Sequence, residues 1–213
     1  ADRHCTTLRI AAPMIDFDEM RVALDRGEFY LEYLPIVTLV DGRCIGAEAL
    51  SRWQRTHDVV QPIDFILKME NTPLSGALTY WAIDTVAVEL KEWLRSHPDA
   101  HVSINIPPEI AGRGGVLYVG QKSGLAEFGS QVILELTERG LPDSLGLQAI
   151  DRAHTHGVKL ALDDVNLVRG GSLAILARCA FDIIKLDRAL IAQITADDPR
   201  PAWLDGIAAL LVS

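Results

Sequence analysis

The sequence predicts an α/β fold built on a mostly parallel sheet, and we favour a closed (β/α) barrel over an open, doubly wound sheet. Apolar strand-like runs alternate with helix-like segments over most of the 213 residues. The strands are nearly continuous apolar runs, which is typical of parallel sheets covered on both faces. Each strand after the first ends near a group that can bind a metal or transfer a proton. In a barrel these strand ends converge on one face, whereas in an open sheet they spread along an edge.

The first half of the chain is predicted to contain a linker, a short helix, a hairpin and a long helix. Aromatic and β-branched residues indicate the hairpin strands, and Asp41-Gly42 is the turn signal between them. Apolar residues that recur every four positions indicate the long helix. In order, the segments are linker 1–15, helix 16–26, strand 29–37, strand 44–53 and helix 78–94.

The second half is predicted to alternate between strand and helix. It begins with a strand closed by Pro107 and Pro108, and a glycine-rich connector follows whose helical part has no clear bounds. The predicted strands are 101–106, 132–137, 158–162 and 181–186, and the predicted helices are 144–156, 173–178, 188–194 and 202–212.

The charge balance restricts the partners of the chain. Twenty Lys and Arg against 29 Asp and Glu give a formal net charge of −9, which argues against binding long nucleic acid or an anionic membrane. Cys5, Cys44 and Cys179 are scattered without CxxC spacing, so neither a disulfide framework nor a zinc site is expected. With no signal or transmembrane stretch in the sequence, we expect a cytoplasmic location.

Acidic and amide groups at successive strand ends suggest a metal site. The candidate residues are Glu48, Asn105, Glu135, Asp163, Asp164 and Lys185. Several carboxylates at one face repel each other unless cations lie among them, and such oxygen donors suit Mg²⁺ or Mn²⁺ rather than zinc. The pair Asp163-Asp164 can serve two metals, and Lys185 can stabilise transition-state charge or orient a water.

Each of these residues, taken alone, also has an ordinary structural explanation. A strand-end acid is commonly a helix N-cap, a loop ion pair or a solvated group, and Lys185 can extend its amine from the core edge to solvent. Together, their occurrence at successive strand ends favours a shared site.

The segment Gly46-Ala-Glu-Ala-Leu-Ser-Arg-Trp53 resembles the signature of the EAL domain, the bacterial cyclic di-GMP phosphodiesterase family. The resemblance extends in order from about Phe29 to Ser213. The supporting matches are Pro62–Ile66, Asn105 in Ser-Ile-Asn-Ile-Pro, Glu135–Glu138, Asp163-Asp164 and Lys185–Asp187.

This resemblance implies a modified TIM (β/α)8 barrel with an antiparallel first strand, spanning residues 16–213. It further implies hydrolysis of cyclic di-GMP to linear pGpG at a site with two Mg²⁺ or Mn²⁺ ions. By resemblance, the metal ligands are Glu48, Asn105, Glu135, Asp163 and Asp164. Catalytic roles fall to Lys185, Glu48 and Glu138, the last of which positions the loop after the fifth strand. Substrate contacts fall to Leu50, to Arg52 at a phosphate and to Asp187 at a guanine.

The chain departs from the family pattern in three places. Leu34 replaces the usual glutamine, the loop at 165–172 lacks the usual sequence, and the chain ends before the seventh and eighth barrel strands. We therefore expect an incomplete barrel with weak or no activity in this 213-residue chain. A catalytically inactive cyclic di-GMP receptor or signalling module is the alternative function, and a metal-dependent lyase or isomerase on the same barrel type is a third.

The resemblance also carries expectations about partners. A homodimer is expected, together with a fused sensory or GGDEF-type domain in the parent protein. No membrane contact by this domain is expected, although the parent protein could be membrane-anchored.

Overall fold

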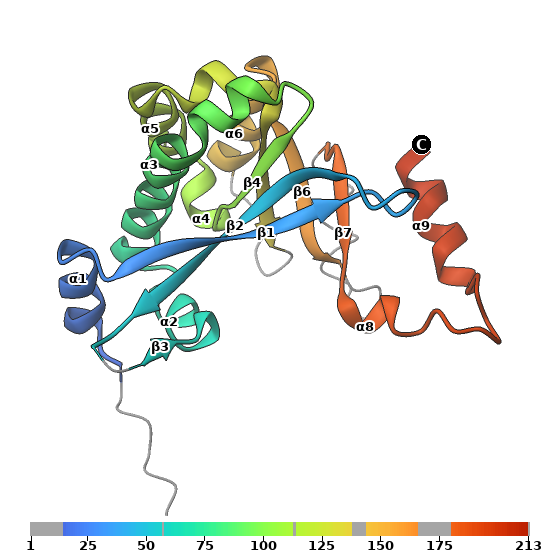
Figure 1. Cartoon of the computed structure of the whole chain (residues 1–213), viewed down its shortest axis with the longest axis horizontal. Coiled ribbons are helices and arrows are strands. Elements are labelled where there is room, and N and C mark those ends of the chain that lie inside the picture. Colours follow the sequence, from blue (N-terminus) through green and yellow to red (C-terminus); the bar gives the residue numbers. More distant parts are fainter. Residues whose placement is uncertain (1–14, 57, 113, 138–143, 166–179, 213) are drawn as a thin grey trace, which may run out of the picture.

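In the computed structural model, a seven-stranded sheet organises the chain, with residues 15–56, 58–112, 114–137, 144–165 and 180–212 described (Figure 1). The strand order is β1-β2-β4-β5-β6-β7, and β3 pairs with β2 at the side. The strands are β1 (Phe29–Val37), β2 (Cys44–Gln54), β3 (Val59–Val60), β4 (His101–Asn105), β5 (Val132–Thr137), β6 (Lys159–Val165) and β7 (Ile183–Leu186).

The sheet is mostly parallel, and its first strand is antiparallel to the second. β1 and β2 form an antiparallel hairpin, and the two-residue β3 is also antiparallel to β2, while the pairs β2-β4, β4-β5, β5-β6 and β6-β7 are parallel. This confirms the predicted α/β fold with an antiparallel first strand. Within the described residues, β1 and β7 are the two edges of the sheet and do not pair with each other. The described strands therefore form an open part of a barrel.

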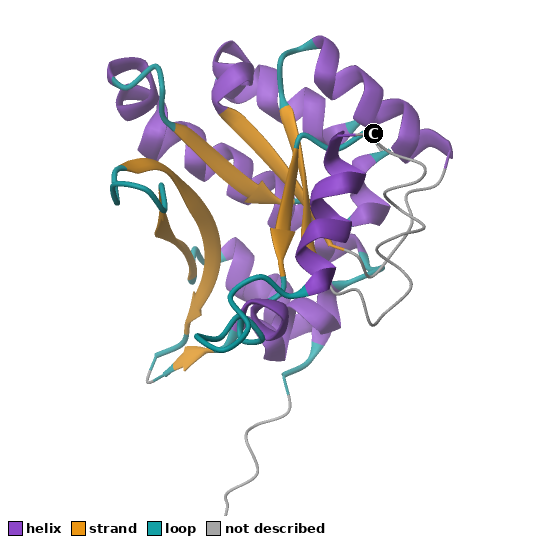
Figure 2. Cartoon of the chain, turned by 90° about the vertical axis from the view of Figure 1, so that its right-hand side faces the viewer, coloured by secondary structure: helices purple, strands orange, loops and turns teal. Residues whose placement is uncertain are grey.

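Helices α3, α5 and α6 cover one side of the sheet (Figures 1 and 2). The helices are α1 (Phe17–Asp25), α2 (Pro62–Met69), α3 (Pro73–Ser96), α4 (Pro108–Ala111), α5 (Gly115–Ser123), a 3-10 helix η1 (Leu125–Gln131), α6 (Ser144–Thr155), α8 (Arg188–Ile191) and α9 (Ala202–Val212). In the described part of the chain, no helix combines the length and the apolar character needed to cross a bilayer.

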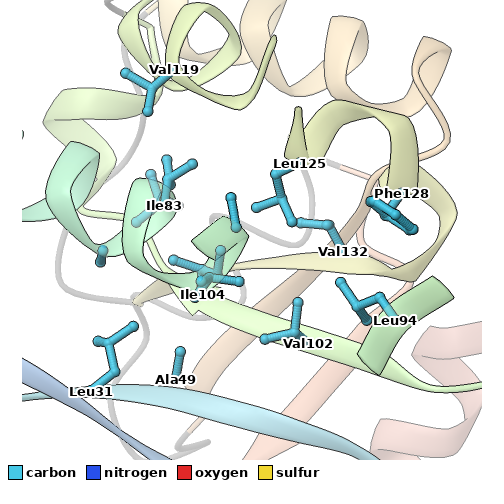
Figure 3. Close-up of a cluster of buried hydrophobic side chains, with 14 residues drawn as sticks. Leu31, Ala49, Ile83, Leu94, Val102, Ile104, Val119, Leu125, Phe128 and Val132 are labelled. Atoms are coloured by element: carbon cyan, nitrogen blue, oxygen red, sulfur yellow. The ribbon is translucent and has the colours of Figure 1, made fainter. Parts of the chain in front are cut away.

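The main apolar core lies between α3 and the sheet. Figure 3 shows Ile83 and Leu94 of α3 in one cluster with Val102 and Ile104 of β4. Residues 102–104 of β4 are all buried, including the polar Ser103, as expected of a strand that is covered on both faces.

Helix starts follow the local sequence. Asp16 caps α1 by accepting a 2.7 Å hydrogen bond from the Glu19 amide. Thr72 caps α3 through the Leu74 amide, and Pro73 occupies the first helical position, where the missing N–H leaves no intrahelical bond unmade.

The helix at residues 62–69 and the helical content of the glycine-rich connector were not anticipated with defined bounds. In α2 the buried residues are Phe65 and Met69, which are four positions apart. One such pair is too little to identify a helix from the sequence. The helix predicted at 188–194 ends earlier, at Ile191. The predicted linker at 1–15, except Ile15, and the predicted helix at 173–178 lie outside the described residues.

Candidate functional site

Three carboxylates from three strands meet at one end of the sheet. Glu48 lies on β2, Glu135 on β5 and Asp163 on β6, and one oxygen from each lies within 4.8 Å of the others. The strand register explains this convergence, since Asp163 is the direct neighbour of Thr137, two residues after Glu135 and therefore on the same face. The structure thus brings together three of the five residues expected to bind metal.

Asn105 joins this cluster from β4. It is the direct neighbour of Glu135 in the parallel register, and its amide nitrogen donates to Glu48 Oε1 at 3.4 Å. An amide held by its nitrogen keeps its oxygen as an acceptor, so Asn105 adds a neutral oxygen donor to the carboxylates.

The ammonium of Lys185, on β7, lies among the same carboxylates. Its Nζ is 2.6 Å from Glu135 Oε2, 3.2 Å from Glu48 Oε2 and 3.2 Å from Asp163 Oδ1. One cation therefore contacts all three acids, and it offsets part of the repulsion that would otherwise separate them. We call Glu48, Glu135, Asp163 and Lys185 the acidic cluster.

Burial and charge shift the protonation of this cluster. Glu135 is only 1% exposed, and burial raises its pKa from 4.5 to about 7, against the lowering effect of the Lys185 hydrogen bond and with a further increase from the charge of Glu48. Burial alone would lower the pKa of Lys185, but the hydrogen bond to Glu135 and the surrounding carboxylates outweigh it, so that this pKa is raised. Lys185 is therefore charged at neutral pH, while Glu135 takes up a proton at a higher pH than an exposed glutamate does.

A cavity of about 380 Å³ lies beside the acidic cluster. This volume is within the range of roughly 300–1,000 Å³ that is typical of small-molecule sites. Its lining includes Glu48, Asn105 and Asp163, together with the predicted substrate residues Leu50 and Arg52 and with Asp164. The cavity thus connects the predicted metal ligands with the predicted substrate contacts.

The opposite wall of the cavity comes from α2 and the start of α3. Ile63 and Leu67 of α2 line it with exposed apolar side chains. Behind them, Phe65 packs edge-on against Trp53 of β2, with ring centroids 6.1 Å apart. Because Trp53 follows Arg52 directly in β2, this aromatic contact fixes α2 beside the strand that carries the predicted phosphate ligand.

The remaining predicted residues differ in their surroundings. Asp164 has a left-handed backbone with φ 56, a conformation that a non-glycine residue rarely adopts. Asp187 caps α8, accepting a 2.6 Å hydrogen bond from the Ala189 amide. Glu138 lies outside the described residues, and so does the altered loop beyond Val165.

Sequence reasoning missed Glu32 on β1. Its Oε2 accepts a 2.6 Å hydrogen bond from Nε of Arg52. Glu32 pairs directly with Leu50, and Leu34 pairs directly with Glu48, so that these β1 residues share one face with the site residues of β2. Residues 30, 32 and 34 are spaced by two along the strand, so the sequence indicates that they share one face. That this face also carries the site residues of β2 becomes clear only when the hairpin register is known.

The comparisons with known proteins agree with this arrangement. The chain is 34% identical over 186 residues to an uncharacterized protein of Mycobacterium tuberculosis, covering 84% of this chain and 60% of that protein. It is 32% identical over 183 residues to the probable cyclic di-GMP phosphodiesterase PdeB of Escherichia coli, covering 84% of this chain and 35% of PdeB. The chain therefore spans about three fifths of one relative and about a third of the other.

Solved structures give the same result. The PaMucR phosphodiesterase in complex with c-di-GMP matches with a TM-score of 0.75 and 28% identity, over 91% of this chain and 80% of that one. The EAL enzyme Bd1971 in its cAMP-bound form matches with a TM-score of 0.72 and 26% identity, over 91% of this chain and 56% of that one. The profile of the EAL domain matches residues 18–213, so the chain belongs to the EAL domain family.

Proposed function

We propose that the chain hydrolyses cyclic di-GMP to linear pGpG, with Mg²⁺ or Mn²⁺ bound by the acidic cluster. The observation that carries this proposal is the meeting of Glu48, Glu135 and Asp163 within 4.8 Å, beside a cavity of about 380 Å³. Support comes from the relatives, since PdeB is named a probable cyclic di-GMP phosphodiesterase and the PaMucR phosphodiesterase structure contains c-di-GMP.

The donor set fits a hard divalent ion. Three carboxylates and the Asn105 amide provide oxygen donors, with no sulfur and no imidazole among them, as Mg²⁺ and Mn²⁺ prefer. Asp164 follows Asp163 and lines the same cavity, so the two-metal form of the proposal assigns the second ion to this pair. When bound, the ions would polarise the phosphodiester and lower the pKa of a bound water.

The chain's own residues then divide between substrate binding and charge stabilisation. The phosphate of an anionic substrate binds Arg52, the predicted phosphate ligand in the cavity wall. Lys185 is charged at neutral pH and lies within 3.2 Å of all three carboxylates. From that position, its ammonium can stabilise the negative charge that develops on the phosphoryl oxygens.

The reaction consumes one water. The phosphorus gains a hydroxyl oxygen, one P–O3′ bond breaks, and the departing ribose oxygen takes up a proton. The product keeps both phosphates, one of which becomes a terminal 5′-phosphate, and this product is pGpG.

The test is chromatographic detection of pGpG after incubation of the full-length protein with cyclic di-GMP and either metal, because the 213-residue chain alone is expected to show weak or no activity. Glu48→Ala should abolish the product, because it removes one of the three clustered carboxylates. Asp84→Asn is the matched control, since Asp84 is an exposed carboxylate of α3 that does not line the cavity. A folded full-length protein that forms no pGpG with either metal would refute the hydrolase proposal.

A second candidate function is a cyclic di-GMP receptor without turnover. Leu34 favours it, because this side chain lies directly opposite Glu48, is 56% exposed and offers no hydrogen bond where related domains carry glutamine. Calorimetry separates the two functions, since a receptor binds cyclic di-GMP at micromolar concentration and yields no pGpG.

Several narrower roles remain predictions. They are the guanine contact of Asp187, the loop-positioning role of Glu138, the homodimer, the fused sensory or GGDEF-type domain and the cytoplasmic location.

A further inference from the structure

We propose that Glu32 is a positioning residue that holds the Arg52 guanidinium in place to receive a phosphate of the dinucleotide substrate. This inference rests on the proposed function, because Arg52 is the predicted phosphate ligand. The observation behind it is the 2.6 Å hydrogen bond from Arg52 Nε to Glu32 Oε2. The sequence pattern does not predict this contact, and the acidic cluster can form without it.

The hairpin register makes this contact possible. Tyr30 is the direct partner of Arg52, and Glu32 is the direct partner of Leu50. Arg52 and Glu32 are therefore diagonal neighbours on one face of the sheet, a separation that two long side chains can bridge. Leu50 and Glu48 share that face, so Glu32 lies on the same surface as the cavity residues of β2.

A second contact completes the restraint on Arg52. Its Nη1 donates to the carbonyl oxygen of Ser51 at 3.1 Å. A guanidinium has five N–H groups, of which Glu32 and Ser51 use two. Within the described part of the chain, the other three N–H groups, all on the terminal nitrogens, have no hydrogen-bond partner. Those nitrogens are the pair that binds phosphate in a bidentate manner.

The position of Arg52 relative to the acidic cluster suits a substrate with more than one phosphate. Arg52 lies four residues beyond Glu48 on β2, which corresponds to roughly 13 Å at the usual strand rise. Both residues line the same cavity. A dinucleotide whose one phosphate lies at the acidic cluster can therefore extend its other end toward Arg52, and Glu32 acts on substrate binding rather than on the reacting atoms.

Two effects of Glu32 on an anionic ligand oppose each other. Its carboxylate holds Arg52 in one rotamer, which removes an ordering cost that binding would otherwise carry. The same carboxylate repels the phosphate, but Glu32 is about half exposed, and solvent screens charges at such positions. Arg52 donates one hydrogen bond to Glu32 and one to the Ser51 carbonyl oxygen, which leaves three N–H groups on its terminal nitrogens for a phosphate. We therefore expect positioning to outweigh repulsion.

The experiment compares Glu32→Ala with Glu32→Gln in the full chain. Calorimetry measures cyclic di-GMP binding in EDTA, where metal-dependent turnover stops, and a Mn²⁺ assay measures kcat and KM. We expect Glu32→Ala to raise Kd and KM about 2- to 10-fold, the range for disordering one long side chain, with kcat within twofold of the wild type. Glu32→Gln keeps an oxygen that accepts from Nε and should restore both values.

Glu92→Ala is the matched control, because it also removes an exposed carboxylate paired with an arginine, Arg95, but on α3 away from the cavity. It should leave Kd unchanged. If Glu32→Ala binds as tightly as the wild type, or more tightly, Glu32 repels the ligand or is irrelevant to it, and the inference is overturned while the proposed function stands. A wild-type chain that binds no cyclic di-GMP would instead refute the proposed function, and this inference with it.

Discussion

Replacing Glu135 by glutamine should change how the stability of the metal-free chain depends on pH. The pKa of Glu135 lies near 7 instead of 4.5, mainly because the side chain is buried. The folded state therefore holds the proton more tightly than the unfolded state does. This tighter proton binding stabilises the folded state in full below pH 4.5, and the stabilisation is lost as the pH rises through 7.

The size of this effect follows from the two pKa values. Each tenfold change in proton affinity is worth about 1.4 kcal/mol, so the difference corresponds to roughly 3 kcal/mol, most of it expressed between pH 5 and 8. Glu135→Gln has nearly the same shape but does not titrate. The free energy of unfolding of the wild type should therefore fall by about 3 kcal/mol relative to that of the variant as the pH rises.

The assay is urea unfolding of both proteins in EDTA across this pH range. Lys185 stays charged throughout, because its pKa is raised, so it adds no titration of its own. Saturating Mn²⁺ at pH 8 should then stabilise the wild type, by about 2.7 kcal/mol at a hundredfold excess over Kd, and Glu135→Gln much less. Two parallel stability curves in EDTA would refute the electrostatic reasoning about this site.

Three further substitutions test other parts of the structure. Lys185→Met should abolish pGpG formation yet tighten Mn²⁺ binding at least tenfold at pH 8.5 by calorimetry, because no ammonium within 3.2 Å of the carboxylates then competes with the ion. Gln131→Leu should lower the free energy of unfolding by about 2 kcal/mol in urea, since the Gln131 amide nitrogen lies within 3.1 Å of three carbonyl oxygens at the end of α3 and the loop after it. Gly46→Ala should lower the melting temperature, with about 1–3 kcal/mol of overpacking, because its Cβ would lie 2.4 Å from the carbonyl oxygen of His101. An unchanged melting curve would show that β2 and β4 adjust freely at that point.

The fold was largely predictable because its strands are buried on both faces. Runs such as 101–106 and 132–137 are recognisable without tertiary information, and the resulting strands are β4 and β5. The antiparallel direction of β1 follows from its short Asp41-Gly42 connection to β2. The helix α2 was harder to predict, because its eight residues contain only one pair of buried apolar positions at helical spacing.

The site was predictable where the chemistry lies at strand ends and not where it depends on side-chain contacts. Asn105 and Glu135 each lie near the end of their strand, and parallel strands end at the same edge of a sheet. Their proximity could therefore be predicted without knowing any side-chain contact, and the two residues are direct neighbours. In contrast, the contact between Glu32 and Arg52 depends on the hairpin register and on the rotamers of both side chains. Likewise, the sequence does not show that Asp187 caps α8, because an N-cap and a ligand contact call for the same carboxylate.

The charge of the acidic cluster explains why it fits a divalent ion better than a monovalent one. With all groups ionised, Glu48, Glu135 and Asp163 carry three negative charges and Lys185 carries one positive charge, which leaves a net charge of −2. One divalent ion balances that charge. Without the ion, protonation of Glu135 relieves part of the repulsion, and the pKa of Glu135 is raised to about 7 first by burial and then by the charge of Glu48. Ion binding must therefore displace a proton from Glu135 as the pH falls below 7, and the ion affinity should drop with acidification until it loses about tenfold per pH unit. The same carboxylates thus share a proton in the metal-free chain and would hold the ion in the proposed enzyme, and Lys185 offsets their repulsion while no ion is bound.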